Sequence, residues 1–273
     1  MNGNNTINSS TPFDKIFSYL LIVAGIVGLY YLYYYLFGPK VGTKYDLITK
    51  TMSATLDPSS PMIVTADKLP PMYEGGEFTV STWIYLNNWS YRAGFNKSIL
   101  SIGGPNFDTI RVYLGGNRPS LSVRFHTKER GAVPTGGEQA PAESLDKSTQ
   151  AATFTQLQTD QTNSNMLGGT SICDIPEVEL QRWVQLTIAV NGRTVDVYQD
   201  GKLARSCVLP NMYRVDAGGY SAKLLGYGGF GGLIGTTVMY DAALNPEEVY
   251  RKYMAGPEAI DNMLDWFKSF FKV

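Results

Sequence analysis

The stretch from Ile16 to Pro39 contains no charged residue, and this feature constrains the chain more than any other. Its apolar part, IFSYLLIVAGIVGLYYLYYYLF, is about 22 residues long, which as a helix spans about 33 Å and matches a bilayer core. Thr11 and Pro12 are suited to the first turn, and Gly38-Pro39 to the end. We therefore expect a transmembrane helix over 12–38. The alternatives are a buried core helix and a cleaved signal peptide, but the short apolar stretch and small-residue cleavage site of a signal peptide are not evident.

The charges around this helix predict its orientation. Lys40, Lys44 and Lys50 follow it, whereas only Lys15 precedes it. By the positive-inside rule the C-terminal domain then lies in the cytosol. The end of the helix is also crowded with tyrosines, more than one interfacial belt needs, and this favours contact with a neighbouring protein helix: Tyr30, Tyr31, Tyr33, Tyr34 and Tyr35.

The overall charge excludes several function classes. A net charge of -1 argues against nucleic acid as a partner, because such binding needs a basic face. The single histidine, His126, and the two cysteines are too few for a zinc site of the Cys/His type. We expect no cofactor, and His-dependent catalysis only if His126 were the base.

From about Met62 onward the chain alternates short apolar and polar runs between Gly, Asn and Asp residues, which is typical of an all-β sandwich. The run FTVSTWIYLNNW, Phe78 to Trp89, places Phe78, Val80, Thr82, Ile84 and Leu86 on one face. Further strands are expected at Ser98 to Ile102, Ile110 to Leu114, Leu121 to Thr127, and within Lys223 to Tyr240.

Two tight turns predict three antiparallel strands between Trp183 and Leu209. A turn at Asn191-Gly192 would pair Ile188 with Val195 and Leu186 with Val197, so that apolar meets apolar. A second turn at Asp200-Gly201 would pair Tyr198 with Leu203 and Asp196 with Arg205.

These residues resemble the laminin-G-type, concanavalin A-like jelly roll over about residues 60 to 257. The motifs that carry the resemblance are FTVSTWIYLNNW, CDIPEVELQRWVQLTIAVNGRTVDVYQDGKLARSCVL and GGFGGLIGTTVMYDAALNPEEVYRKYMAGP. Together with the N-terminal anchor they are similar to versions encoded by nucleocytoplasmic large DNA viruses. The resemblance implies an antiparallel jelly-roll sandwich, but this fold serves lectins, glycosidases and interaction modules alike.

The resemblance also bears on the two cysteines. A disulfide between Cys173 and Cys207 would close a loop worth roughly 3 to 4 kcal/mol. Cytosolic topology favours two reduced, buried cysteines instead. Large DNA viruses of this type carry their own thiol oxidases, so the resemblance favours the disulfide.

Catalytic groups are not evident. Glycosidases of this fold use carboxylates two residues apart on one strand, about 5 Å from each other. The nearest spacing, Glu177-Val178-Glu179, follows Pro176 and is interpreted as a solvated loop, and His126 as a surface or packing residue. The glycines of Gly226 to Gly235 lack the context of a phosphate loop and are interpreted as sites of bends and close sheet packing.

Some members of the fold bind calcium through loop Asp and Asn residues. Here Asn87, Asn88, Asp108 and Asp216 have the right chemistry. Because nothing in the sequence fixes their mutual geometry, no metal ligand is assigned.

The predicted organisation is a tail (1–11), the transmembrane helix (12–38), a linker (39–60), the sandwich (61–256) with an insertion at about 128–171, and an amphipathic C-terminal helix (257–273). The insertion is either mobile or ordered by neighbours. The C-terminal helix either packs on the sandwich or docks on a membrane or partner. A short helix is expected from Asn245-Pro246-Glu247 through Met254.

We expect a non-enzymatic structural virion protein, a membrane-anchored minor capsid component that links the internal membrane to the capsid shell. Its partners would be the bilayer, capsid or other virion proteins, and further copies of itself. The alternative is a glycan-binding attachment module in which Trp83, Trp89 and Tyr91 stack on sugars. A third possibility is a degenerate glycosidase that uses Glu177 and Glu179. An attachment lectin must face outward from the particle, whereas the lysine bias predicts a domain facing the capsid.

Overall fold

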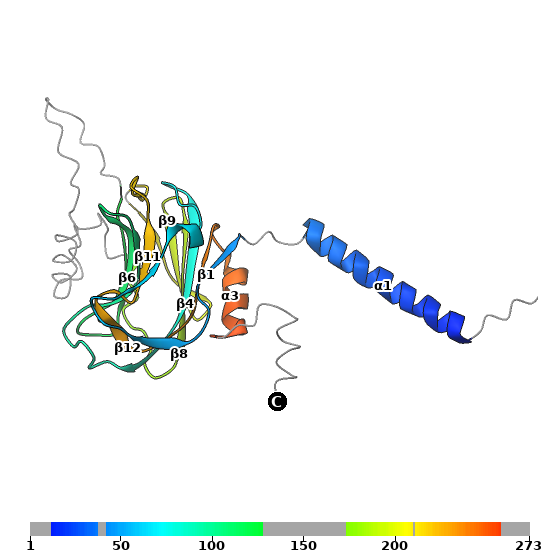
Figure 1. Ribbon diagram of the computed structural model, residues 1–273, viewed down its shortest axis with the longest axis horizontal. Coiled ribbons are helices and arrows are strands. Elements are labelled where there is room, and N and C mark those ends of the chain that lie inside the picture. The colour runs from blue at the N-terminus through cyan, green and yellow to red at the C-terminus, as the bar shows by residue number, and fades with distance from the viewer. Residues whose placement is uncertain (1–11, 38–41, 128–172, 210, 258–273) are drawn as a thin grey trace, which may run out of the picture. The chain divides into compact units, whose positions relative to one another are not determined.

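A computed structural model describes residues 12–37, 42–127, 173–209 and 211–257 (Figure 1). The chain divides into two compact units, Met1–Val41 and Gly42–Val273. In the first unit, α1 (Pro12–Phe37) is a single helix that begins at the predicted residue and ends one residue before the predicted boundary. Its window Ile16–Tyr33 has a mean hydropathy of 1.9, and no part of it is buried in the protein. This helix is therefore long and apolar enough to cross a membrane.

The second unit consists of two antiparallel sheets, as the sequence predicts. The larger, seven-stranded sheet has the order β1 (Lys44–Ile48), β12 (Gly229–Tyr240), β4 (Glu77–Asn88), β8 (Trp183–Asn191), β9 (Thr194–Gln199), β10 (Lys202–Val208), and β2 (Met52–Thr55) also pairs with β12. The smaller sheet has the order β3 (Met62–Val64), β11 (Ser221–Leu224), β5 (Lys97–Gly103), β6 (Asp108–Leu114), β7 (Leu121–Phe125). Two short 3-10 helices, η1 (Ala66–Lys68) and η4 (Gly226–Gly228), lie in the connections.

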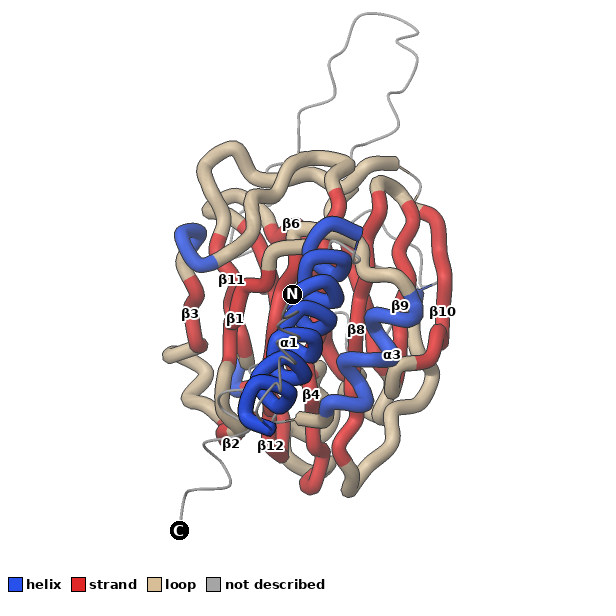
Figure 2. Tube along the Cα trace, turned by 90° about the vertical axis from the view of Figure 1, so that its right-hand side faces the viewer, coloured by secondary structure: helices blue, strands red, loops and turns tan. Residues whose placement is uncertain are grey.

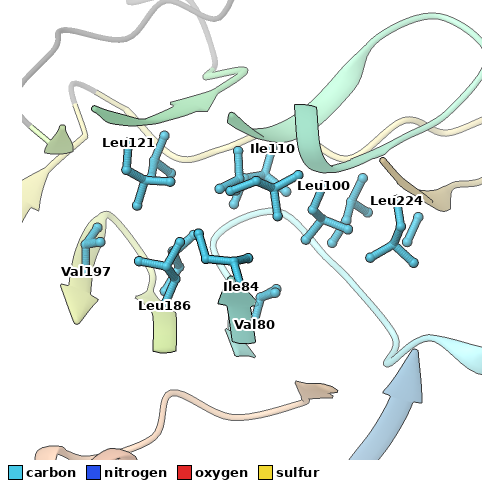
Figure 3. Packing of buried hydrophobic residues seen from close by; sticks show 14 of the residues in the cluster. Val80, Ile84, Leu100, Ile110, Leu121, Leu186, Val197 and Leu224 are labelled. Atoms are coloured by element: carbon cyan, nitrogen blue, oxygen red, sulfur yellow. The ribbon is translucent and has the colours of Figure 1, made fainter. Parts of the chain in front are cut away.

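The core lies between the two sheets, where alternate residues of each strand face one another (Figure 3). Val80 and Ile84 of β4 point toward residues of the smaller sheet such as Leu100 and Ile110. The predicted inward face of β4 is confirmed, and Thr82 on that strand is buried with its hydroxyl 2.8 Å from that of Thr237. Burial of this apolar surface, at about 25 cal/mol per Å², is the main favourable contribution to folding.

The turn of the first predicted hairpin lies one residue further along the chain than expected. The turn occupies Gly192 and Arg193, so Ile188 pairs with Val197 and Val190 with Val195. The predicted pairings of Ile188 with Val195 and of Leu186 with Val197 are therefore wrong, although a displacement of two residues keeps the same side chains inside. Gly192 alone takes a positive φ, of 60°, and Asn191 remains in the strand.

The predicted turn of the second hairpin is confirmed, but the strand pairing that follows it differs from the prediction. Tyr198 pairs with Leu203 across the turn at Asp200-Gly201, but a bulge follows Leu203. The bulge places Ser206 opposite Asp196, whose carboxylate accepts a 2.5 Å hydrogen bond from the serine hydroxyl. The predicted Asp196–Arg205 pair is thus wrong, because one extra residue shifts the register.

The outer face of the larger sheet is covered by α3 (Pro246–Ala255), which crosses in front of β8 and β9 in Figure 2. Asn245 caps this helix: its side chain accepts from the Glu248 amide, and the Glu248 carboxylate accepts from the Asn245 amide, both at 2.9 Å. Val249 and Leu244 pack against a small second cluster with Ala189, Tyr198 and Tyr240. The helix expected over 245–254 is therefore present.

The glycines at the start of β12 let two backbones approach closely. A Cβ on Gly232 would lie 1.9 Å from the Tyr85 carbonyl oxygen, and one on Gly231 would lie 2.3 Å from that of Asn88. Gly229 combines a φ of 62° with a similar approach to Ala54. Close sheet packing thus explains the glycine-rich run, as the sequence analysis expected.

Three predicted segments lie outside the described residues. These are the N-terminal tail 1–11, the insertion at about 128–171 and all but the first residue of the C-terminal helix 257–273. Their predicted roles stay predictions.

Candidate functional site

The three aromatic residues predicted to stack on sugars have different surroundings in the structure. Trp83 lies on the outer face of the larger sheet, where it is 6% exposed and stacked on Tyr253 of α3 with ring centroids 5.7 Å apart. This ring is therefore buried against α3, and its role in stacking on a sugar stays a prediction.

Trp89 and Tyr91 lie in the β4–β5 loop and both support it. The Lys97 ammonium sits 4.0 Å from the centroid of the partly buried Trp89 ring and donates to the carbonyl of Arg92 at 3.3 Å. Tyr91 donates its hydroxyl to the Gly228 carbonyl at 3.0 Å. Both side chains are thus engaged in holding the loop against its neighbours.

The carboxylates and the histidine considered for catalysis have contacts of other kinds. Glu177 and Glu179 are exposed on either side of the buried Val178, and Glu179 pairs with Arg182. His126 stacks on Phe107 with ring centroids 4.3 Å apart, which is a packing arrangement. Among the described residues these groups form no general acid and base pair.

Of the four residues considered for calcium, Asn87 is exposed, and the other three have different partners. The Asn88 side-chain oxygen accepts from the Tyr91 amide at 3.2 Å, and Asp108 is paired with Arg111. Asp216 accepts three hydrogen bonds, from the Asn106 amide at 2.7 Å, its side chain at 2.9 Å and the Gly218 amide at 2.9 Å. Burial acts to raise the pKa of Asp216, but these hydrogen bonds outweigh it and lower the pKa. The described part of the chain holds no cluster of three or more His, Cys, Asp or Glu residues suited to a metal ion.

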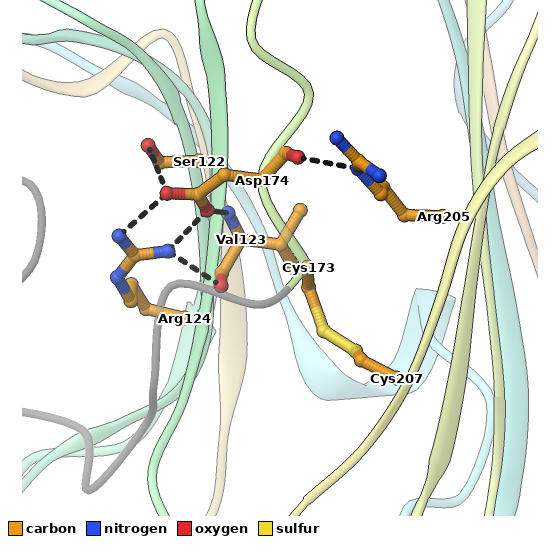
Figure 4. Close-up of polar contacts among 7 residues, drawn as sticks. All are labelled: Ser122, Val123, Arg124, Cys173, Asp174, Arg205 and Cys207. Atoms are coloured by element: carbon orange, nitrogen blue, oxygen red, sulfur yellow. Dashed lines mark hydrogen bonds and ion pairs between the residues drawn. A yellow bond between two sulfur atoms is a disulfide. The ribbon is translucent and has the colours of Figure 1, made fainter.

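The two cysteines are joined. The Cys173–Cys207 disulfide connects Cα atoms 5.7 Å apart and attaches the segment that precedes β8 to β10, the edge strand of the larger sheet (Figure 4). The neighbouring Asp174 forms a two-point ion pair with Arg124 of β7, the edge strand of the smaller sheet, with one N–O distance of 2.9 Å. Its backbone carbonyl accepts from Arg205 of β10 at 3.3 Å. Residues 173–175 therefore form a clasp between the two sheets, which the isolated bridge of Ile175 to Leu121 extends.

A pocket with a volume of about 210 Å³ opens on the outer face of the smaller sheet. Its floor is a row of side chains in register across three strands: Lys223 of β11 opposite Ser101 of β5, and Ser101 opposite Arg111 of β6. The guanidinium of Arg111 donates from Nε to the Asp108 carboxylate at 3.0 Å and also from Nη2. The remaining lining residues come from the β2–β3 connection and from η4: Pro58, Pro61, Gly226 and Tyr227.

The sequence analysis did not identify this pocket, because its polar residues are 122 positions apart at the extremes and meet only through strand pairing. One signal was present. Arg111 and Lys223 each stand between apolar neighbours, in Ile110-Arg111-Val112 and Ala222-Lys223-Leu224, so strand alternation places both charges on the outer face. The pocket lining also includes Tyr227, an aromatic residue within a run of glycines.

These features define an antiparallel β-sandwich protein of the jelly-roll type that carries an apolar N-terminal helix. No protein-family model and no curated protein matches the sequence. Among solved structures the chain is similar to the botulinum neurotoxin serotype D ligand-binding domain in complex with N-acetylneuraminic acid, with 14% identity, a TM-score of 0.44, and coverage of 79% of this chain and 45% of that chain.

Two further neighbours have the same character. One is the receptor-binding domain of botulinum neurotoxin D, with 13% identity, a TM-score of 0.45, and coverage of 76% of this chain and 44% of that chain. The other is the binding domain of botulinum neurotoxin DC in complex with rat synaptotagmin II, with 12% identity, a TM-score of 0.38, and coverage of 71% of this chain and 39% of that chain. The chain thus spans less than half of the length of these structures. A likeness of this degree concerns the arrangement of strands and carries no information on ligand or activity.

Proposed function

We propose that this chain is a non-enzymatic structural protein that is anchored in a membrane by α1 and makes protein contacts through its sandwich. The observation that carries the proposal is the helix window Ile16–Tyr33, which is apolar and has no buried surface within the protein. A helix of this kind requires a bilayer or a partner to cover it. The pairing of Glu179 with Arg182 and the stacking of His126 on Phe107 are consistent with a role without chemistry.

The specific setting that we propose is the virion of a nucleocytoplasmic large DNA virus. There the chain would be a minor capsid component of laminin-G-like type that links the internal membrane to the capsid shell. The support for this setting is the resemblance of the CDIP and ALNPEEVY motifs together with the anchor. Single-pass topology with a cytosolic sandwich, as the lysines after α1 predict, directs the domain toward the shell.

The alternative role in glycan attachment would require an exposed aromatic platform. Trp83 is covered by Tyr253, and Trp89 and Tyr91 are engaged with Lys97 and Gly228. No described observation favours these three residues as a sugar-binding surface, and we do not propose that function for them.

A topology experiment on the full chain in microsomes tests the proposal. We expect the protein to resist extraction by alkaline carbonate and its sandwich to be digested by protease added to the cytosolic side. Replacing Ile22 and Val23 by lysine should release it, since a charge at the helix centre costs about 2.5 to 3.5 kcal/mol. Ile63→Lys, at an exposed strand position, is the matched control and should leave extraction unchanged.

Two results would contradict the proposal. Release of the unaltered chain by carbonate would exclude the anchor, and a sandwich fully protected from protease would place it away from the capsid shell. The virion setting is tested separately by a density map of the intact particle, in which a jelly-roll domain should lie between the membrane and the shell.

A further inference from the structure

The pocket on the outer face of the smaller sheet has an unbalanced charge. Two cations and one carboxylate line it, and Asp108 is already paired with Arg111. Arg111 and Asp108 are almost fully buried, with side chains 2% and 5% exposed, so their charges largely compensate each other. Lys223 is only partly buried and has no ion pair within the described part of the chain. The lining formed by the described residues therefore carries an excess of one positive charge.

Within the described ranges, the acid nearest to the pocket in sequence is directed elsewhere. Asp57 precedes the wall residue Pro58, but its carboxylate accepts from the Ser59 amide at 2.8 Å and from the Ser59 hydroxyl at 2.6 Å. Those hydrogen bonds lower the pKa of Asp57, with the larger effect from the hydroxyl and the smaller from the amide. They also hold the Asp57 carboxylate within its own turn. Ser101, 8% exposed on the floor between Lys223 and Arg111, supplies a hydroxyl. The floor is thus equipped to receive an oxyanion.

The remaining residues that line the pocket are Pro58, Pro61, Gly226 and Tyr227. The backbone around Tyr227 has an unusual conformation. Leu225 and Tyr227 have φ values of 56° and 57°, in the left-handed region that non-glycine residues seldom adopt. Such strain costs about 1 to 3 kcal/mol at each residue and persists only where the surroundings enforce it.

Two contacts enforce this conformation of the η4 loop. The Gly228 carbonyl accepts from the Tyr91 hydroxyl at 3.0 Å and from the Leu56 amide at 3.4 Å. The same structure therefore holds Tyr227 at the edge of the pocket. The loop is fixed before any ligand arrives, which reduces the entropic cost of binding.

We propose that this pocket binds a small organic monoanion carried on a ring, with its oxyanion at Lys223 and Ser101 and its ring against Tyr227 and Pro58. One uncompensated cation matches one negative charge. The volume of about 210 Å³ exceeds that of a cavity of about 150 Å³ that holds benzene, so a six-membered ring with a carboxylate or sulfate group fits. This site is separate from α1 and from the clasp, and it does not depend on the structural role proposed above.

Titration calorimetry and saturation-transfer NMR on the full chain in nanodiscs test the site. The probes are glucuronate and glucose 6-sulfate for a saccharide ring, benzoate for an aromatic ring, and glucose, benzyl alcohol and acetate as references. We expect one or more ring anions to bind with 1:1 stoichiometry at least about ten-fold more tightly than the matching neutral compound, as a charged hydrogen bond predicts. The preferred ring and anion then identify the natural source.

Variants locate the binding. Lys223→Met should weaken the binding of the ring anion by about ten-fold or more. Lys202→Met, at an exposed lysine of β10, should leave this affinity unchanged. Tyr227→Asn tolerates the left-handed φ and should remove the preference for a ring anion over acetate. Thermal unfolding of each variant verifies its fold.

Three results would overturn the proposal. These are absence of binding by every ring anion at about 10 mM, equal binding by neutral and anionic probes, and equal weakening by Lys223→Met and Lys202→Met. None of them bears on carbonate extraction or protease access, so this inference and the proposed function fail separately.

Discussion

At the scale of single residues, the buried charges of the sandwich differ in whether an acid compensates them. Arg111 and Arg124 each face a carboxylate, Asp108 and Asp174. Lys97 instead donates to two backbone carbonyls, those of Arg92 and Phe95, and lies against the Trp89 ring. Burial, assisted by the charge of Arg92, lowers the pKa of Lys97 to about 8.

Lys97 should make stability depend on pH in the alkaline range. Its pKa is about 8 in the folded protein and close to the usual 10.5 when unfolded, so between these values the unfolded chain binds more protons. The free energy of unfolding should therefore increase as the pH rises above about 8. The increase should end near pH 10, where tyrosines such as Tyr213 and Tyr240, whose pKa burial raises in the folded protein, begin to ionise in the unfolded chain. Urea unfolding of the full chain in detergent at a series of pH values measures this change in stability.

Lys97→Met should abolish the increase in stability with pH, and Lys202→Met should retain it. A free energy of unfolding that falls over this pH range in the unaltered protein would refute the assignment.

The Asp174–Arg124 pair should contribute strongly to stability. The Arg124 side chain is 0% exposed, and Asp174→Asn would leave its charge uncompensated. We expect a loss of about 3 kcal/mol in the free energy of unfolding, as for other buried pairs that lose one partner. Glu247→Gln breaks an exposed pair with Arg251 on α3 and should cost no more than about 1 kcal/mol. Equal effects of the two substitutions in chemical denaturation would argue against the clasp.

At the scale of elements, the sequence predicted strands and faces better than it predicted registers. The alternation in Phe78–Leu86 predicts the inward face of β4, because burial of one face imposes a period of two residues. The turn at Gly192-Arg193 differs from the expected one by a single residue, since either placement keeps Ile188 and Val197 inside. The bulge after Leu203 had no local signal, because it follows from pairing with β9. The pocket was hidden for the same reason: Ser101, Arg111 and Lys223 are neighbours only in the finished sheet.

The glycine-rich start of β12 gives a prediction at this scale. Gly232→Ala would place a Cβ 1.9 Å from the Tyr85 carbonyl oxygen, so the β4–β12 pairing must shift. We expect a loss of about 1 to 3 kcal/mol, or failure to fold, as for other overpacked sites. Gly226→Ala is the control, because its Cβ would meet Ser98 at an ordinary 3.5 Å. Thermal unfolding distinguishes them, and a Gly232→Ala protein as stable as the control would contradict the close approach.

At the scale of the whole molecule, the disulfide and its ion pair join the open edges of two sheets. The bond closes a loop between positions 34 residues apart, which in the chain-entropy model stabilises the fold by about 3 to 4 kcal/mol. Reduction, or the double substitution of Cys173 and Cys207 by alanine, should lower the free energy of unfolding by that amount. Denaturation with and without reductant measures the change, and thiol labelling of the denatured, unreduced chain provides the control. Labelling of both cysteines there would exclude the bond.

The position of β1 determines how the sandwich responds to mechanical force. The chain enters the sandwich at Thr43, whose amide donates to Asp241 at 2.6 Å, and continues directly into β1 at one edge of the larger sheet. A force applied at residue 42 therefore acts first on the Lys44–Tyr240 pair and would separate β1 from β12 one residue pair at a time. The Cys173–Cys207 disulfide lies at β10, the opposite edge of the same sheet, so it does not cross-link the β1–β12 pair. If α1 is held in a membrane, tension on the chain would therefore reach the five-residue β1 before the other strands of the larger sheet.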